Sequence, residues 1–237
     1  MTVDKPYNEY FLLRAAFMRY QGRPNIVNLQ EQTIVIIGPR YRVGQPGVRT
    51  INTTSHNIGD WQSDLSPFKL GPNILWDGRT SQKMENSWQF SKVYKAHLGP
   101  DGKPNATWWE WSSAGFANPK AVRYPMGRGA KPEGSWWKNQ MLGYIDARKQ
   151  IYFPLYRDSV KTTEGWKRLQ AIYRKLVSAQ RNNARINLWD FDAYNHHGNG
   201  LSLKQVLNNP HAIMGHAFVV AAMLIYGEDI EPDSLPD

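Results

Sequence analysis

The chain has 237 residues, of which 41% are hydrophobic and 21% are charged, a composition typical of a folded globular protein and unlike that of a disordered one. It contains no cysteine, which excludes disulfides, zinc–thiolate centres and cysteine nucleophiles. The formal net charge of +9 favours polyanionic partners, because lysine and arginine side chains displace counterions from phosphates. We therefore expect a phosphate-bearing nucleotide or nucleic-acid partner.

Neither a membrane span nor an export signal is predicted. The nearest candidate for a span, residues 212–226, is shorter than the roughly 18 residues that a transmembrane helix needs, and it contains His216, so it predicts a buried helix. The first ten residues, MTVDKPYNEY, lack the basic and then apolar pattern of a signal peptide. The expectation is a cytoplasmic protein with no membrane partner.

Residues 1–55 are predicted to form an N-terminal extension of one helix and a β-hairpin. Aromatic and apolar side chains recur at helical spacing over residues 7–20. The runs Thr33–Ile37 and Val48–Asn52 predict strands, and a basic turn rich in glycine and proline joins them.

The middle of the chain predicts one long helix and one long loop. Ser81 is a residue type that caps helix N-termini, and Gly99 and Pro100 stop the helix after Leu98. Residues 101–135 are irregular in pattern and rich in glycine, and we expect them to be functional because connections of that length are seldom idle.

The second half of the chain predicts mainly helices. One runs from Ser135 to Phe153, where Pro154 ends it, and another begins at Thr163. Their apolar side chains recur at the spacing of one helix face.

The C-terminal part adds a strand over Ala184–Phe191 and a last helix that opens at Asn209-Pro210 and ends at Gly227. Residues 231–237 are expected to be a flexible tail. Together the elements predict an α+β fold that is predominantly helical: a single compact domain with a short β-hairpin or small sheet.

The helix predicted from Ser81 places Glu85, Trp88, Gln89 and Lys92 on one face, because residues three and four apart are neighbours on a helix. The helix dipole stabilises a carboxylate in the first turn. The same spacing also suits an ordinary solvated surface. Spacing alone therefore leaves both a functional and a structural interpretation open.

The segment Asp77–Lys92 (DGRTSQKMENSWQFSK) combines an aspartate–glycine turn with glutamate, an aromatic residue, glutamine and lysine on one predicted helix. This combination resembles the signature of the NADAR (YbiA-like) family. Three further stretches agree with that family in order: Gly59-Asp60-Trp61 with Ser66-Pro67-Phe68, Met126-Gly127-Arg128 with Lys131-Pro132 and Trp136 or Trp137, and Asp192-Ala193-Tyr194 with Gly198-Asn199-Gly200. The resemblance covers roughly residues 59–227. The chain departs from the pattern at Asn86, where the family usually has histidine, and at Asn195-His196, which replaces a Trp-Gly pair.

The resemblance implies a NADAR-like catalytic domain over residues 56–230. Family members act as N-glycosidases that release ADP-ribose from guanine or cleave an intermediate of the riboflavin pathway. Two alternatives stay open: a non-catalytic basic nucleic-acid-binding protein, and a glycosyl-transfer or base-modification enzyme on the same scaffold. A basic binding protein needs no carboxylates in its groove, so convergence of Glu85, Gln89 and Asp192 in one pocket would favour an enzyme.

Cleavage of an N-glycosidic bond develops positive charge on the sugar, so a nearby carboxylate stabilises the reacting state or activates water. Glu85 is predicted to be that carboxylate and Asp192 the second catalytic one, with Asp190 as its rival. The predicted substrate contacts are Trp88, Gln89, Lys92, Asn86, Gly127, Arg128, Trp136, Asp190 and Tyr194.

Several of these contacts have specific predicted roles. Gln89 suits ribose hydroxyls or a base edge, and Lys92 suits a phosphate or would hold Glu85 ionised. Arg128 suits a pyrophosphate, unless it bonds the carbonyls of its own turn. No metal or cofactor is predicted, because His196-His197 has no acidic partners at ligand spacing and is expected in a polar loop.

Overall fold

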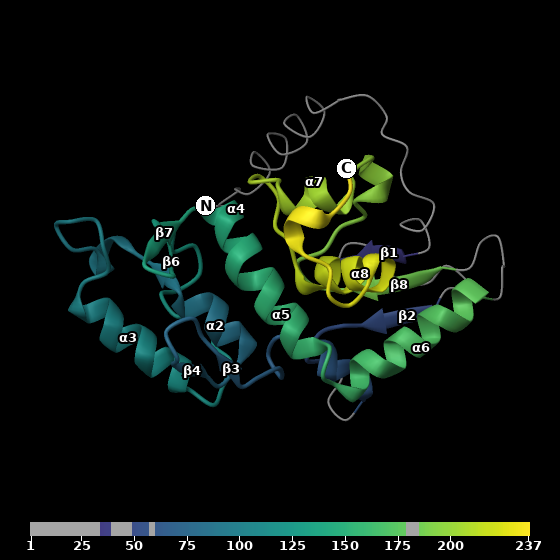
Figure 1. Cartoon of the computed structure of the whole chain (residues 1–237), viewed down its shortest axis with the longest axis horizontal. Coiled ribbons are helices and arrows are strands. Elements are labelled where there is room, and N and C mark those ends of the chain that lie inside the picture. Colours follow the sequence, from purple (N-terminus) through teal and green to yellow (C-terminus); the bar gives the residue numbers. More distant parts are fainter. Residues whose placement is uncertain (1–33, 39–48, 57–59, 179–184) are drawn as a thin grey trace, which may run out of the picture.

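The computed structural model describes residues 34–38, 49–56, 60–178 and 185–237 (Figure 1). The helix predicted over residues 7–20 lies outside these residues. The fold is α+β with small sheets, as predicted, and helices outweigh strands. None of the helices in the described ranges combines the length and the apolar character of a membrane span.

A three-stranded parallel sheet brings two strands from the first quarter of the chain next to one from its C-terminal part. β8 (Ile186–Trp189) lies in the middle, and β1 (Ile34–Ile37) and β2 (Arg49–Asn52) each pair with it in parallel. The positions of the three predicted strands are confirmed, but the predicted hairpin between β1 and β2 is wrong. The apolar run of β8 is buried, and a strand buried in this way is most stable between two partners. β1 and β2 therefore share a sheet with β8 from the C-terminal part and do not form a unit of their own.

A long helical segment crosses the centre of the molecule (Figure 1). It consists of α4 (Tyr144–Ala147), the π-helical turn η4 (Arg148–Tyr152) and α5 (Phe153–Val160). The sequence predicts that Pro154 ends a helix, but in the structure Pro154 occupies the first turn of α5. The hydrogen-bonding pattern changes at the π-helical turn, so the missing N–H of a proline is tolerated there.

The segment before α4 is a hairpin and not the predicted helix from Ser135. β6 (Gly134–Trp137) and β7 (Gln140–Leu142) pair in antiparallel fashion. Lys138 and Asn139 between them have φ angles of 48° and 62°, the left-handed conformation that a two-residue hairpin turn requires.

The predicted helix Ser81–Leu98 is shorter than expected. α2 covers Met84–Phe90, and Lys92–Val93 forms β5, which pairs with β6. Ser81 belongs to the short strand β4 (Thr80–Ser81), which pairs with β3 (Asn73–Ile74). Val93, which lies beyond α2, is buried, and the pairing of β5 with β6 and not a helix turn buries it.

Residues 101–135 are not wholly irregular, because they contain α3 (Ala106–Ala117). The side chain of Asn105 caps this helix by accepting a hydrogen bond from the N–H of Trp108 at 3.0 Å. Residues 118–133, which follow α3, are the part of the loop that reaches the cavity described below.

The C-terminal helices bury the main core. α6 (Glu164–Ser178) begins after Thr163 as predicted, and α8 (His216–Tyr226) ends at Gly227 as predicted. α8 begins at His216 and not at Asn209-Pro210. The intervening residues form a turn after the separate helix α7 (Leu203–Leu207), where Arg148 bonds the carbonyls of Asn209 and Ala212. Short 3₁₀ turns complete the described fold: η2 (Trp61–Leu65), η3 (Lys95–His97), η5 (His197–Asn199) and η6 (Pro232–Ser234).

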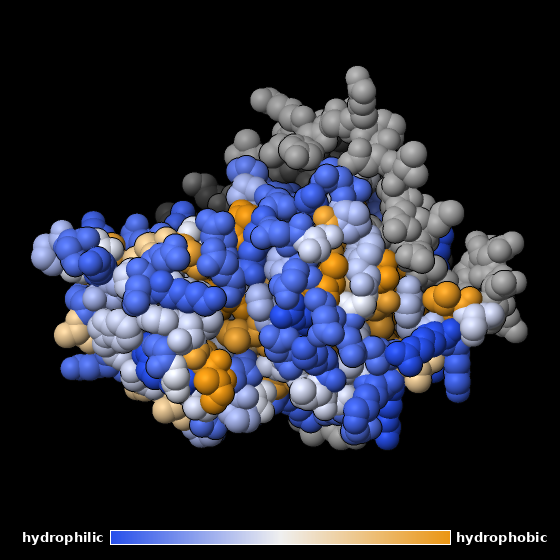
Figure 2. Space-filling model, viewed as in Figure 1, coloured by the Kyte–Doolittle hydropathy of each residue, from blue (hydrophilic) through white to orange (hydrophobic). Residues whose placement is uncertain are grey.

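The last seven residues, which the sequence predicts to be a flexible tail, include two buried side chains, Pro232 and Leu235. Leu235 is 2% exposed within the main core, and Lys149 holds Asp233 at 2.9 Å. The face seen in Figure 2 is mostly hydrophilic, with several small apolar patches and no single broad one.

Candidate active site

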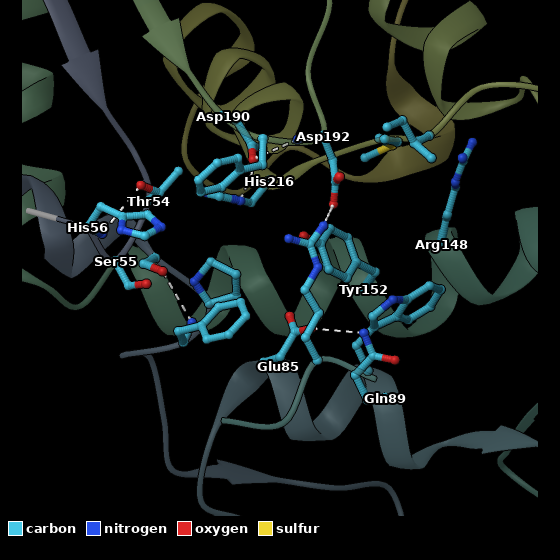
Figure 3. A pocket seen from close by; sticks show the side chains of 18 of the residues that line it. Thr54, Ser55, His56, Glu85, Gln89, Arg148, Tyr152, Asp190, Asp192 and His216 are labelled. Atoms are coloured by element: carbon cyan, nitrogen blue, oxygen red, sulfur yellow. Dashed lines mark hydrogen bonds and ion pairs between the residues drawn. The ribbon is translucent and has the colours of Figure 1, made fainter. Parts of the chain in front are cut away.

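One cavity of about 470 Å³ lies where α2, the π-helical turn and the end of β8 meet. Its walls come from seven short segments: Thr54, Ser55 and His56; Ser66, Pro67 and Phe68; Glu85, Trp88 and Gln89; Arg123 and Arg128; Tyr144, Arg148 and Tyr152; Asp190, Phe191 and Asp192; Ile213, Met214 and His216. Figure 3 shows Glu85 and Gln89 on one side, with Asp190, Asp192 and His216 opposite. The three residues whose convergence the sequence left open, Glu85, Gln89 and Asp192, line the same cavity.

Glu85 is a buried carboxyl group on the cavity wall. It lies in the first turn of α2, and its backbone N–H donates to Pro67 O at 3.0 Å, which packs the Ser66-Pro67-Phe68 turn against the helix. Burial raises the pKa of Glu85 from its usual 4.5 to about 7. The hydrogen bond from Gln89 and the positive charges of Arg123 and Lys92 oppose this rise. Near neutral pH both protonation states are therefore populated.

A chain of hydrogen bonds along α2 and β5 links Glu85 to Gln89 and Lys92. Gln89 Nε2 donates to Glu85 Oε1 at 2.8 Å, and Lys92 Nζ donates to Gln89 Oε1 at 2.7 Å. Lys92 Nζ also lies 5.1 Å from the centre of the Trp88 ring. Burial lowers the pKa of Lys92 to about 8, and the charge of Glu85 opposes this. Lys92 is thus placed to tune Glu85 through Gln89. It is not among the residues that line the cavity, and its predicted contact with a phosphate stays a prediction.

Asp190 and Asp192 follow the end of β8 and differ in their surroundings. Asp190 is 3% exposed and accepts hydrogen bonds from the N–H groups of Asp192 and Ala217, both at 3.2 Å. Its Oδ2 lies 3.1 Å from His216 Nδ1, and His216 Nε2 lies 2.7 Å from Thr53 O. A Cβ on Gly215 would fall 2.1 Å from Asp190 Oδ2. Asp190 therefore fastens the start of α8 to the sheet.

Asp192 is the more available carboxylate. Its side chain is 40% exposed and pairs with Arg123, whose Nη2 lies 2.5 Å from Asp192 Oδ2. The positive charge of Arg123 also lowers the pKa of Glu85, and the negative charge of Glu85 raises the pKa of Arg123. Of the two carboxylates between which the sequence does not choose, Asp192 is the more exposed and Asp190 is the more fully hydrogen-bonded within the fold.

Several residues of the wall were missed at the sequence level, among them Arg123, Tyr152 and Arg148. Arg123 comes from the loop after α3, whose course depends on long-range contacts. Tyr152 is aimed into the cavity by the π-helical turn, and its ring meets that of Trp88 edge to face at 5.2 Å. Burial, followed by the nearby carboxyls of Asp190 and Glu85, raises the pKa of Tyr152 well above its usual value, so its hydroxyl stays protonated.

Arg148, the third, is a structural residue despite its place on the wall. It is 1% exposed. Its guanidinium donates to the carbonyl oxygens of Val206, Leu207, Asn209 and Ala212 and to the Tyr144 hydroxyl. Arg148 thereby satisfies the carbonyls at the end of α7, which have no partner within that helix.

Of the predicted substrate contacts, Trp88, Gln89, Arg128 and Asp190 line the cavity, but four others besides Lys92 do not. Trp136 is 7% exposed in a core cluster with Val93 and Trp108, because as part of β6 it faces inward. Tyr194 packs against Phe218, with ring centres 5.1 Å apart, and burial raises its pKa to about 12. Gly127 supplies a turn with φ of 88° beside Arg128.

Asn86, the fourth, is 0% exposed and points away from the cavity into the loop after α3. His196 is 1% exposed and its ring contacts that of His197 at a tilt, with ring centres 3.9 Å apart, so the expected polar loop is partly buried. Over the described residues there is no group of three or more histidine, cysteine or acidic side chains placed to hold a metal ion.

No family model matches this sequence, and no curated protein and no solved structure gives a significant match to it. The resemblance to the NADAR family therefore rests on the sequence motifs. The structure adds that Ser66-Pro67-Phe68, Glu85, Gln89, Arg128 and Asp192, which come from four of those motifs, line one cavity.

Proposed function

We propose that this protein is an N-glycosidase that hydrolyses the N-glycosidic bond of an ADP-ribose-type conjugate or a related modified nucleoside. The observation that carries the proposal is Glu85: a buried carboxyl with a pKa of about 7, on the wall of a cavity that also holds the Asp192–Arg123 pair. Perturbed carboxyls in clefts are typical of catalytic sites, and a single carboxyl poised near neutral pH suits general acid–base chemistry.

The reaction adds one water across the bond between the sugar and the base. As the C1′–N bond breaks, its electron pair leaves with the base and positive charge develops on the sugar. The oxygen of water bonds to C1′, the Glu85 carboxylate accepts one proton of that water, and the departing base takes a proton from solvent. Glu85 then returns its proton to solvent. Because the carboxylate form is active, kcat/KM should rise with pH through about 7.

The rest of the wall suits the sugar and its phosphates. Asp192 and Glu85 face each other across the cavity (Figure 3) and would both stabilise the developing positive charge. The Tyr152 hydroxyl is close enough to these carboxyls for their negative charge to raise its pKa. It makes no hydrogen bond to any described residue, so it is able to bind a sugar hydroxyl. Arg128, which hydrogen-bonds no described residue, would contact a phosphate. The volume is within the roughly 300–1,000 Å³ range of ligand pockets.

Hydrolysis can be tested with ADP-ribosylated guanosine, free and within an oligonucleotide, in water enriched in ¹⁸O. We expect release of ADP-ribose that carries one ¹⁸O atom, together with guanosine from the free conjugate or the unmodified oligonucleotide, detected by mass spectrometry. The variant Glu85→Gln keeps the shape of the side chain but removes its negative charge, so kcat should fall about 100-fold or more. Glu110→Gln, which changes an exposed glutamate on α3, is the matched control and should leave kcat unchanged.

Each other result has a defined meaning. Unchanged turnover in Glu85→Gln would remove the mechanism. Product without ¹⁸O would indicate transfer to another acceptor. Binding of the oligonucleotide without any cleavage would favour the non-catalytic nucleic-acid-binding protein.

A further inference from the structure

Asn86 is next to Glu85 in sequence but faces the opposite way, into the loop that follows α3. Its side chain is completely buried. Its Nδ2 donates to Asn118 O and Lys120 O, both at 2.9 Å, and its Oδ1 accepts from the N–H of Val122, also at 2.9 Å. One amide thus ties three successive points of this loop to α2.

The residue after these three points is Arg123, which turns into the cavity. Its guanidinium pairs with Asp192 at 2.5 Å and lies 5.3 Å from the centre of the Tyr124 ring. The last backbone bond that holds the loop before Arg123 is the one from Val122 to Asn86. The Asn86 amide therefore fixes the backbone directly before Arg123.

The chemistry of the contact explains why an amide stands at position 86. The loop presents two carbonyl oxygens and one N–H, so the side chain must donate twice and accept once. Asparagine does both. An aspartate cannot donate, an apolar side chain can do neither, and each would leave buried backbone groups without partners.

We propose that Asn86 is a positioning residue of the candidate active site: through the loop over residues 118–122 it places Arg123 between Asp192 and Glu85. The proposal rests on the proposed function only in calling the site catalytic. The placement itself is a property of the protein without substrate, so it can be tested without turnover.

The charge of Arg123 supplies the readout. Four groups act on the Glu85 carboxyl besides its burial: Gln89, Arg123 and Lys92 lower its pKa, and Asp192 raises it. Asn86 is uncharged and acts on Glu85 only by where it puts Arg123. Displacement of Arg123 should therefore raise the pKa of Glu85, whereas a purely structural loss should not change it.

The experiment follows the Glu85 carboxyl by NMR in protein labelled with ¹³C at the glutamate side-chain carboxyl, without substrate. The resonance is assigned by its absence in Glu85→Gln. We expect Arg123→Gln to move the titration midpoint to higher pH and Asn86→Ala to move it in the same direction. The double variant should shift no further than Arg123→Gln alone, because both changes remove the same interaction. With substrate, kcat/KM of Asn86→Ala should fall about ten- to a hundredfold, the scale for residues that orient a site.

Asn105→Ala is the matched control. The Asn105 side chain also donates to two carbonyls, Ala96 O and Leu98 O, and accepts from one backbone N–H, but it lies outside the cavity wall. Its loss should lower the melting temperature and leave the Glu85 midpoint in place. If Asn86→Ala does not fold, Asn86→Ser, which keeps one donor, replaces it. A wild-type midpoint in a folded Asn86 variant, or shifts that add in the double variant, would overturn the proposal whether or not the protein is a glycosidase.

Discussion

On the side of the cavity formed by β8 and α8, Asp190 accepts two backbone hydrogen bonds and pairs with His216. On the α2 side, Glu85 is about as deeply buried but accepts one hydrogen bond from within the described residues, that of Gln89. Two carboxyls of similar exposure thus differ in how far the protein itself satisfies them. A satisfied buried carboxyl stabilises the fold, whereas a buried carboxyl with remaining acceptor capacity is available to a ligand.

The arginines of the wall repeat this contrast. Arg148 donates to four carbonyls and one hydroxyl, whereas Arg128 is exposed and lies 5.7 Å from the Tyr124 ring without a hydrogen bond to any described residue. Proximity to a cavity therefore does not identify a functional side chain. The number of hydrogen bonds that the fold leaves unmade is the better indicator.

The largest expected effect is a loss of stability when Asp190, on the β8 and α8 side of the cavity, is replaced. Asp190→Ala removes the acceptor of two buried N–H groups and the partner of His216. We expect the free energy of unfolding to fall by about 3–5 kcal/mol, the cost of breaking a buried pair, measured by urea denaturation. Asp192→Ala should cost less than about 1 kcal/mol, because its ion pair is partly exposed. Equal losses would contradict the distinction between the two aspartates.

The next effect has the opposite sign and belongs to Glu85. A carboxyl whose pKa is raised by folding contributes stability below pH 4.5 and loses that contribution as pH rises through about 7. Glu85→Gln should therefore match the wild type near pH 4 and exceed its stability by about 3 kcal/mol above pH 8, the free-energy equivalent of that shift. Glu110→Gln should show no such pH dependence. A glutamine variant that is less stable at every pH would show that Glu85 is structural.

The smallest effect concerns Arg128, the arginine without hydrogen-bond partners in the described chain. Arg128→Ala should raise KM about tenfold with a smaller loss in kcat, as removal of a phosphate contact does. The melting temperature should change little, whereas Arg148→Ala should lower it markedly. Wild-type binding should also weaken as salt rises. A KM unaffected by both Arg128→Ala and salt would argue for an uncharged ligand.

The elements that sequence predicted correctly are those with local signals. The start of α6 follows Thr163, whose Oγ1 accepts from the N–H of Trp166 at 3.1 Å, and Gly227 ends α8. The end of α2 was missed because Val93 is buried in either case: a helix would have buried it by periodicity, and the structure buries it by pairing β5 with β6. Periodicity reports that a side chain is buried and does not report which partner buries it.

The residues of the candidate site also divide into those with a local sequence signal and those that long-range contacts place. Glu85 and Gln89 were predicted together because four-residue spacing on a helix brings side chains into contact, and they are hydrogen-bonded at 2.8 Å. Arg123 was not predicted, because its place depends on hydrogen bonds between Asn86 and a loop more than 30 residues away. Tyr152 was missed because a π-helical turn, which has no reliable sequence signal, sets its direction.

The central claim is that Glu85 is a buried carboxyl poised near neutral pH in a ligand cavity. Its titration in the wild-type protein, followed through the ¹³C resonance that disappears in Glu85→Gln, tests this most directly. We predict a midpoint near pH 7, and a shift of that midpoint when ADP-ribose binds. A midpoint near 4.5 that ADP-ribose does not move would contradict both the burial of the charge and the place of Glu85 in the site.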